Sequence, residues 1–156
     1  MVKIREPEEK DLMHFTRYAV EFLHTMDAGK SERRTLNERI KERKYWAADQ
    51  FLARDPKQKL LFADMDGRIV GYILGTIDKE SEAKVYGYIR ELFVDEFYRR
   101  EGIGTELSDA LLTWMDEQEV KSIQVGVKAQ QSRVNDFIRA IGFIPVSTLY
   151  EYQKKS

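Results

Sequence analysis

The sequence has no cysteine and only two histidines among its 156 residues. Without cysteine the chain can form no disulfide, no thiolate nucleophile and no cysteine-ligated metal site. His14 and His24 stand ten positions apart, which is a poor spacing for two ligands of one metal ion. We therefore expect neither a metal centre nor a Ser-His-Asp triad.

Charge of one sign and long apolar runs are also missing. The 26 basic residues offset 27 acidic ones, so composition gives no general argument for binding nucleic acid or a membrane surface. No apolar run approaches the roughly 18 residues that cross a bilayer, and residues 1–7 lack the apolar core of a signal peptide. We expect no nucleic-acid or membrane partner, and a cytoplasmic protein.

Apolar and aromatic residues are present in sufficient number for a folded core. Hydrophobic residues make up 42% of the chain and aromatic residues 12%, which excludes a disordered chain. A chain of 156 residues suits one domain that buries its core without disulfides. We therefore expect residues 1–156 to form a single domain.

Hydrophobic periodicity predicts ten elements in the order β-α-α-β-β-β-α-β-α-β. Asp66-Gly67 indicates a hairpin between the second and third strands, and Gly142 ends the last helix. Residues 27–31 are expected to separate the first two helices, with Ser31 or Thr35 as a cap of the second helix. The expected strands are 2–5, 59–64, 68–77, 83–94, 122–127 and 146–153, and the expected helices are 8–26, 32–53, 102–115 and 131–141. This order predicts an α/β (α+β) fold, a mixed sheet with helices on its faces.

Residues 89–105 are the most informative segment: a strand, a basic turn with glycines, and a helix start. Such a turn leaves backbone N–H groups unpaired, and the helix dipole adds positive potential. Gly102 and Gly104 let the backbone approach a ligand closely, while Arg99 and Arg100 add positive charge. The segment predicts a phosphate or pyrophosphate site. The alternative is a structural turn with solvated arginines.

Two common phosphate loops do not match this segment. A P-loop needs Gly-Lys-Ser/Thr, whereas Gly104 is followed by Thr105 and Glu106. A dinucleotide-binding fingerprint needs a third glycine where this chain has Leu107. The strand of that fingerprint opens a parallel βαβ unit, whereas the strand in this chain follows a hairpin.

The run from Leu92-Phe93-Val94 through residues 98–104, Tyr-Arg-Arg-Glu-Gly-Ile-Gly, resembles the acetyl-CoA-binding motif of the GNAT N-acetyltransferases. That motif is Gln/Arg-x-x-Gly-x-Gly/Ala after a Leu-x-Val strand. The first strand and helix, the hairpin at residues 67–72 and the closing Gly142-Phe143 are also similar to the family. The resemblance covers most of the chain and implies a GNAT-like, mostly antiparallel sheet flanked by helices.

The resemblance implies an N-acetyltransferase that moves an acetyl group from acetyl-CoA to a primary amine by direct attack in a ternary complex. The lack of cysteine also disfavours an acyl-enzyme. The implied partners are acetyl-CoA, as co-substrate, and an amine acceptor, either a small molecule or a protein amine; a homodimer stays open. The alternatives are a non-catalytic acyl-CoA-binding module, transfer of a different acyl group, or a phosphate-loop protein unrelated to acyl-CoA.

The resemblance also implies which residues bind the co-substrate. Backbone groups of Leu92, Phe93 and Val94 would pair with the pantetheine arm as if it were a strand. A bulge would splay this strand from the next, and an amide near Phe93 or Val94 would polarise the thioester. Gln131 stands where the family often has asparagine and would contact the pantetheine arm. The pyrophosphate would be bound by Arg99, Arg100, Glu101, Gly102, Ile103, Gly104 and Thr105.

Catalysis needs a base, because an amine is mostly protonated at neutral pH. A carboxylate near the cleft, acting directly or through water, can take this proton. Glu91, just before the pantetheine-pairing residues, is the first candidate, and its alternative role is a solvated or ion-paired strand residue. Glu80, Glu82 and Asp95 rank lower.

The general acid is left open by the sequence. Many family members carry a tyrosine four residues before the closing glycine, where this chain has Ile138, which cannot donate a proton. Another group could protonate the thiolate, or the thiolate could take a proton from water. The substitutes to consider are Tyr86, Tyr88, Tyr150 and Tyr152, for which cross-strand packing is the competing role.

The second helix has a basic first half. We expect an inner face of Leu36, Ile40, Ala47, Phe51 and Leu52, with the basic residues solvated and paired to glutamates at i,i+4 spacing. The alternative for the basic residues is a wall for an acidic substrate or the CoA 3′-phosphate. By the same resemblance, Tyr45 and Trp46 would line the acceptor side. The basic residues are Arg33, Arg34, Arg39, Lys41, Arg43 and Lys44.

Overall fold

The computed structural model describes residues 1–26 and 32–155. The expected break at residues 27–31, with its candidate cap Ser31, lies outside the described residues. The chain forms two compact units, Met1–Val125 and Gly126–Ser156. A single domain over residues 1–156 stays a prediction.

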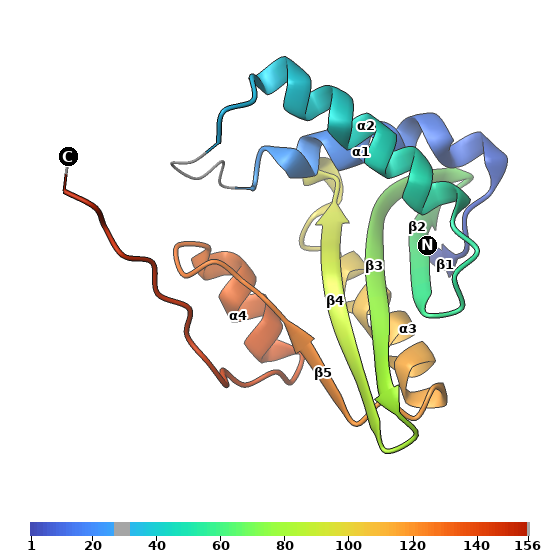
Figure 1. The fold of residues 1–156 in the computed structure, drawn as a ribbon. Coiled ribbons are helices and arrows are strands. Elements are labelled where there is room, and N and C mark those ends of the chain that lie inside the picture. The colour runs from blue at the N-terminus through green and yellow to red at the C-terminus, as the bar shows by residue number, and fades with distance from the viewer. Residues whose placement is uncertain (27–31, 156) are drawn as a thin grey trace. The chain divides into compact units, whose positions relative to one another are not determined.

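The first unit is built on a five-stranded sheet with the order β1-β2-β3-β4-β5 (Figure 1). The first four strands pair antiparallel with their neighbours, and β5 joins β4 in parallel. This mixed, mostly antiparallel sheet confirms the predicted fold class. The strands are β1 (Val2–Arg5), β2 (Gln58–Met65), β3 (Arg68–Ser81), β4 (Lys84–Val94) and β5 (Ser122–Val125).

The hairpin between β2 and β3 forms at the predicted dipeptide. Asp66 and Gly67 adopt φ angles of 54° and 92°, the left-handed conformation that a tight hairpin turn needs at both central positions. The Asp64 carboxylate accepts a hydrogen bond of 2.7 Å from the Gly67 amide and so closes the turn.

Helices α1 (Leu12–Leu23) and α2 (Leu36–Leu52) lie on one face of the sheet (Figure 1). A short 3-10 helix, η1 (Glu9–Asp11), precedes α1. Thr35 caps α2: its hydroxyl accepts from the Glu38 amide, and the Glu38 carboxylate accepts from the Thr35 amide, each at 3.1 Å. This capping box satisfies two terminal amides and confirms Thr35 as the cap.

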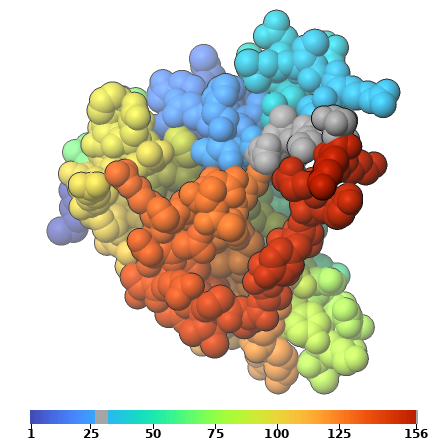
Figure 2. All heavy atoms as spheres, turned by 90° about the vertical axis from the view of Figure 1, so that its left-hand side faces the viewer, coloured from blue at the N-terminus to red at the C-terminus, as the bar shows by residue number. Residues whose placement is uncertain are grey.

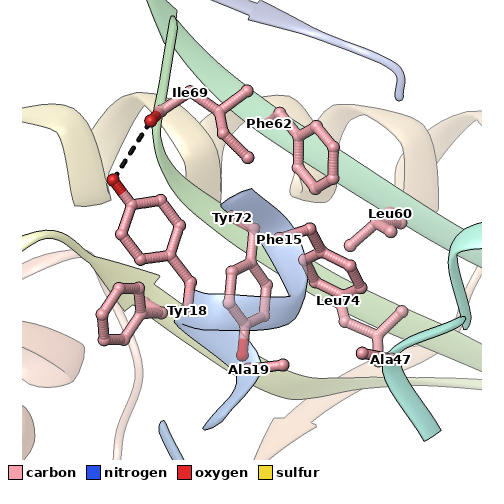
Figure 3. Packing of buried hydrophobic residues seen from close by; sticks show 10 residues of the cluster. Phe15, Tyr18, Ala19, Ala47, Leu60, Phe62, Ile69, Tyr72 and Leu74 are labelled. Atoms are coloured by element: carbon pink, nitrogen blue, oxygen red, sulfur yellow. Dashed lines mark hydrogen bonds between the residues drawn. The ribbon is translucent and has the colours of Figure 1, made fainter. Parts of the chain in front are cut away.

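An aromatic core lies between these two helices and the sheet (Figure 3). Phe15 packs edge-on against Tyr72 with ring centroids 5.0 Å apart, and Tyr18 packs against Phe93 at the same distance. Such pairs add to the stabilisation that comes from burying their apolar area. The core therefore packs α1 against Tyr72 of β3 and against Phe93, near the end of β4.

The inner face of α2 differs from the expectation at three positions. Leu36 and Leu52, its first and last residues, are 52% and 63% exposed, so they do not belong to the inner face. Arg43, expected to be solvated, is only 7% exposed and lies beside the fully buried Ala47. The expectation was wrong here because the ends of α2 lack neighbours to cover them, while Arg43 finds buried polar partners.

Helix α3 (Ile103–Glu117) contacts β1, β2, β3 and β4, and glycines let it approach the sheet closely. A Cβ atom at Gly75 would lie 2.8 Å from the methyl carbons of Leu111, and one at Gly87 would lie 2.7 Å from Met115 Sδ. These contacts are shorter than van der Waals distance, so a larger residue at either position would force the buried Leu111 or Met115 side chain to shift.

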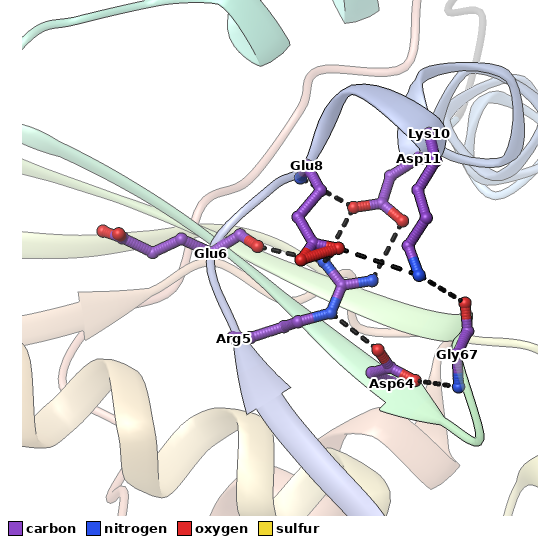
Figure 4. A network of polar contacts seen from close by, with 7 residues as sticks. All are labelled: Arg5, Glu6, Glu8, Lys10, Asp11, Asp64 and Gly67. Carbon is purple, nitrogen blue, oxygen red and sulfur yellow. Dashed lines mark hydrogen bonds and ion pairs between the residues drawn. The ribbon is translucent and has the colours of Figure 1, made fainter.

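A polar network ties β1 to η1 and β2 (Figure 4). The Arg5 guanidinium donates to both oxygens of Asp11, at 2.7 and 3.0 Å, and its Nε donates to Asp64 at 2.7 Å. Asp11 is nearly buried, and its other contacts come from the Glu8 amide. The network anchors the short edge strand β1, which pairs with β2 over only four residues.

The second unit contains α4 (Ser132–Ala140) and an extended C-terminal segment, drawn in red in Figure 2. Gly142, at φ 112°, ends α4 as predicted. The predicted strand at residues 146–153 is wrong: these described residues form neither strand nor helix. Valine, threonine and tyrosine in this segment favour a strand, but a strand forms only where a partner edge accepts it. Val146 and Leu149 are instead 74% and 98% exposed.

Within residues 1–26 and 32–155, no helix combines the length and the apolar composition that crossing a membrane requires.

Candidate active site

Strand β4 changes its pairing at Arg90. Opposite β3, Leu74 faces Glu91 whereas Gly75 faces Ile89, so Arg90 is the extra residue of a β-bulge. On its other side, β4 pairs with β5 only from Tyr86 to Ile89. In the part of the first unit that the structure describes, residues 90–94 thus present an edge that no strand occupies.

The three residues expected to pair with a pantetheine arm lie on this open edge. Leu92, Phe93 and Val94 pair with Ile73, Tyr72 and Gly71 of β3 on one side only. A free strand edge offers N–H and C=O groups at regular spacing, so it can accept an extended ligand as an additional strand.

The chain leaves β4 through a short 3-10 helix, η2 (Glu96–Tyr98), and a left-handed turn into α3. Arg100 and Gly102 adopt φ angles of 68° and 80°. Among the described residues, the backbone amides of residues 99–105 donate none of the hydrogen bonds found. These amides stand at the positive end of the α3 dipole, and together they form an anion-binding geometry.

The side chains of the turn are exposed, with one specific contact. Arg99 Nε donates to the Val94 carbonyl at 3.0 Å, which ties the turn back to the end of β4. Arg100 and Glu101 are exposed, and Ile103 is buried beneath the start of α3. A Cβ at Gly102 would meet no atom within 4 Å, so the space in front of the turn is open.

Glu91 is buried in a polar cluster on the face of the sheet that α1 and α2 cover. It is 7% exposed, and its Oε1 accepts hydrogen bonds from Arg43 Nη2 at 2.5 Å and from Tyr72 Oη at 2.7 Å. Burial, together with the charge of Glu91, raises the pKa of Tyr72 well above its ordinary value. Glu91 therefore lies in an ion pair within the open edge, directly before residues 92–94.

A second buried contact holds the other end of the open edge. Tyr18 Oη lies 2.9 Å from Asp95 Oδ2 and 3.1 Å from the Ile69 carbonyl. Asp95 Oδ1 in turn accepts from the Phe97 amide at 3.1 Å, which caps η2. Burial and the neighbouring Asp95 raise the pKa of Tyr18. Asp95 thus has a structural position at the start of the turn.

Two of the lower-ranked base candidates, Glu80 and Glu82, lie far from the open edge. Glu80 and Glu82 are exposed at the tip of the β3–β4 hairpin, the opposite end of β4 from residues 92–94, and Glu82 pairs with Lys79 at 2.9 Å. Tyr86 and Tyr88 are half-buried on β4 before the bulge, where the Arg90 guanidinium stacks 4.5 Å from the ring centroid of Tyr88.

The remaining predicted residues lie in the second unit. Gln131 precedes α4. Its backbone N–H donates to the Lys128 carbonyl at 3.0 Å, and its backbone carbonyl accepts from Asn135 Nδ2 at 2.9 Å. Ile138 is buried on α4. The tyrosines considered as acids, Tyr150 and Tyr152, are 88% and 85% exposed. The structure thus brings together residues 91–94 and 99–105, which follow one another in the first unit.

Sequence reasoning missed Arg43, Tyr72 and Tyr18 as residues of this region. One signal was available: Arg43 stands at helical spacing from Ile40 and Ala47, two residues expected on the inner face of α2. No comparable signal marks the hydroxyl of Tyr18 or of Tyr72, because their partners lie 77 and 19 positions away in sequence.

These features define a class of protein: one with an open strand edge that runs into an amide-rich turn at a helix N-terminus, a geometry suited to an extended ligand that carries a phosphate. Residues 23–143, most of the chain, match the sequence profile of the acetyltransferase (GNAT) family. The chain belongs to this family.

Individual relatives agree with this assignment. An uncharacterized N-acetyltransferase of Archaeoglobus fulgidus is 30% identical over 139 residues, which are 87% of this chain and 88% of that protein. The fold is similar to that of the aminoglycoside N-acetyltransferase AAC(6')-Iy in complex with CoA, with a TM-score of 0.75, 14% identity and coverage of 100% and 96% of the two chains. It is also similar to a ribosomal-protein-alanine N-acetyltransferase of Brucella melitensis, with a TM-score of 0.71, 15% identity and coverage of 99% and 100%. At these identities the two solved structures speak for the fold alone.

Proposed function

We propose that the protein is an N-acetyltransferase that moves the acetyl group of acetyl-CoA to a primary amine by direct attack in a ternary complex. The observation that carries the proposal is the continuous surface from the open edge at residues 90–94 to the free amides of residues 99–105. Membership of the acetyltransferase family supports it, and a relative of the same fold is known in complex with CoA.

In this proposal the backbone supplies most of the binding to acetyl-CoA. The edge groups of Leu92, Phe93 and Val94 pair with the pantetheine arm, and the amides of residues 100–105 bind the pyrophosphate, with Arg99 and Arg100 adding positive charge. Gln131 contacts the pantetheine arm. Backbone donors suit this role because the open turn keeps them unpaired and fixed in direction before the ligand arrives.

Acetyl-CoA supplies the acetyl group as an activated thioester. The acceptor amine, after losing a proton, attacks the carbonyl carbon, so that a C–N bond forms. An amide near Phe93 or Val94 stabilises the negative oxygen of the tetrahedral intermediate. The C–S bond then breaks, and the thiolate leaves. With no cysteine in the chain, no thioester to an enzyme cysteine can form, which supports direct transfer.

Glu91 is the proposed general base. Its two hydrogen bonds are both accepted by Oε1, so Oε2 is the oxygen that takes the proton of the amine, directly or through a water molecule. The leaving thiolate takes its proton from water in this proposal, because Ile138 replaces the tyrosine that many family members use. Tyr18 and Tyr72 are poor acids here because their pKa values are raised.

The acceptor is a primary amine of either a small molecule or a protein. Relatives with this fold carry names that specify both kinds, an aminoglycoside in one and a ribosomal-protein alanine in another. Pairing of two chains as a homodimer also stays a prediction, which size-exclusion chromatography with light scattering would test.

A thermal-shift titration with acetyl-CoA, CoA, ATP and NAD, followed by a thiol-release assay on an amine panel, tests the proposal. A ligand at about 100 times its Kd adds roughly 2.7 kcal/mol of stability, which is readily seen. We expect a shift with both CoA species and thiol release with at least one amine. If neither acetyl-CoA nor CoA shifts the melting temperature of a folded sample, the proposal is refuted.

A non-catalytic acyl-CoA-binding module is the second candidate, favoured by Ile138 at the position of the usual acid. Binding of acetyl-CoA with no thiol release on any amine would support the module. Faster release from a longer acyl-CoA would indicate transfer of another acyl group, and a shift with ATP alone would indicate an unrelated phosphate-binding protein.

A further inference from the structure

Arg43 joins three elements beneath the open edge of β4. From α2, its Nε donates to the Ala19 carbonyl of α1 at 2.7 Å, and its Nη2 donates to Glu91 of β4 at 2.5 Å. The guanidinium stacks 3.7 Å from the ring centroid of Trp46 and 5.4 Å from that of Phe22. Two donors of this planar group are thus hydrogen-bonded and two aromatic rings lie close to it, an arrangement that a flexible lysine ammonium cannot reproduce.

The ion pair between Arg43 and Glu91 is buried, and burial strengthens the attraction between the two charges. Arg43 and Glu91 are each 7% exposed, so water screens their attraction little. The charged and titratable groups that contact Glu91 are Arg43 from α2 and Tyr72 from β3, while α1 contributes the Ala19 carbonyl through Arg43. A buried carboxylate stays charged only beside a compensating cation.

The position of Glu91 relates this pair to the bulge. Glu91 directly follows the extra residue Arg90 and directly precedes Leu92, the first residue expected to pair with the pantetheine arm. A displacement of α2 would therefore be transmitted through Arg43 to the first residues of the open edge.

We propose that Arg43 is a positioning residue: its guanidinium fixes the direction of the Glu91 carboxylate at the bulge, and couples α1 and α2 to the open edge of β4. This inference rests on the proposed function only for its effect on acetyl transfer. The hold on Glu91 itself can be measured without any activity.

The test compares Arg43→Gln, which removes the cation, with Arg43→Lys, which keeps the cation and removes the planar fork. Arg68→Met serves as the control, because Arg68 is an exposed residue at the start of β3. Three quantities are measured on each folded protein: the position of the ¹³C NMR signal of the Glu91 carboxyl carbon, assigned with Glu91→Gln; the Kd of acetyl-CoA by calorimetry; and kcat with the best acceptor.

In Arg43→Gln we expect the ¹³C signal of the Glu91 carboxyl carbon to move away from its position in the parent protein, because a charged hydrogen-bond donor is lost. The kcat should fall by about ten- to a hundred-fold because the orientation of the carboxylate is lost, while the Kd of acetyl-CoA changes less than about two-fold. Arg43→Lys keeps the charge but not the planar fork, so we expect a smaller movement of the signal and a similar fall in kcat. Arg68→Met should match the parent protein.

An unchanged ¹³C signal of the Glu91 carboxyl carbon in Arg43→Gln would overturn the inference. So would a fall in kcat that is matched by an equally weaker Kd, since this is the result of a merely structural role. If Arg43→Gln does not fold, the kcat of Arg43→Lys decides: a kcat equal to that of the parent protein overturns the inference. If the parent protein acetylates no amine but Arg43→Gln still moves the Glu91 signal, the transferase proposal is refuted and the hold of Arg43 on Glu91 is supported.

Discussion

Single residues determine the chemistry of this site, and Glu91 is the one on which acetyl transfer should depend most. It has a buried carboxylate with one oxygen held by Arg43 and Tyr72. The other oxygen can take a proton. Glutamine is nearly the same size and keeps the backbone of the open edge, but it cannot act as a base.

Glu91→Gln should therefore lower kcat by about a hundred- to ten-thousand-fold, while the Kd of acetyl-CoA stays within about two-fold. Steady-state kinetics and calorimetry measure the two effects. Glu117→Gln, at the exposed end of α3, is the control and should retain the parent kcat. A Glu91→Gln enzyme with unchanged kcat would remove Glu91 from the mechanism.

Asp11 should make the free energy of unfolding depend on pH. Burial alone would raise the pKa of Asp11, but hydrogen bonds from Arg5 and the Glu8 amide bring it below its ordinary value. A lowered pKa in the folded state contributes stability at a pH above the unfolded value, about 3.9. This contribution is lost as the pH falls through the folded pKa.

Asp11→Asn should lower the free energy of unfolding by about 2 kcal/mol at pH 7, the size expected for hydrogen bonds to a charged group. The loss should shrink toward pH 3, because below a pH of about 3.9 the unfolded parent chain binds a proton at Asp11 more readily than the folded chain does. Urea unfolding at both pH values checks this, with exposed Glu9→Gln as the control. An equal loss at both pH values would contradict the electrostatic explanation.

At the scale of elements, the turn into α3 depends on a left-handed residue at its N-terminus. Gly102 and Gly67 form a matched pair: their φ angles are 80° and 92°, and neither has an atom within 4 Å of an added Cβ. Only Gly102 belongs to the proposed pyrophosphate site. The same substitution at the two positions therefore separates backbone strain from loss of binding.

Gly102→Val should raise the Kd of acetyl-CoA at least about ten-fold, since its side chain and backbone strain disturb the amides that bind phosphate. Gly67→Val should bear a similar strain but leave the Kd unchanged. Calorimetric titration of both proteins gives the comparison. Equal Kd values for the two variants would show that the turn is not the phosphate site.

The packing of α3 on the sheet depends on small residues in β3 and β4. Gly75→Ala places a Cβ 2.8 Å from the Leu111 methyl carbons, so it should destabilise the fold by about 1–3 kcal/mol, the usual cost of overpacking. Gly126→Ala, where the Cβ meets no atom within 4 Å, is the control. Thermal unfolding measures both, and equal melting temperatures would refute the close approach.

At the scale of the whole molecule, the two compact units raise a question of cooperativity. We expect residues 1–156 to unfold as one domain, because a single core is usual at this length. Trp46 and Trp114 both report on the first unit, and amide exchange of α4 reports on the second. Coincident urea midpoints from the two probes would support one domain, and separate midpoints would contradict it.

The strands and helices of the first unit, the hairpin at Asp66-Gly67 and the glycine-containing turn before α3 could be predicted from the sequence. Each depends on residues close together in the chain: a periodic apolar face, a pair of turn residues, or glycines after a strand. The family motif at residues 92–104 also lies in one continuous segment. Local physics is therefore sufficient to indicate them.

Tertiary structure alone decided the partners of Glu91, the burial of Arg43 and the absence of a strand at residues 146–153. Arg43 and Glu91 are 48 positions apart in the sequence. Arg43 becomes a buried partner of Glu91, and not a solvated charge, only because α2 packs over β4 in the folded protein. The C-terminal residues 146–153 are rich in residue types that favour a strand, but such a preference is local and provides no partner. Whether a strand forms depends on a partner edge, and that is a property of the folded molecule.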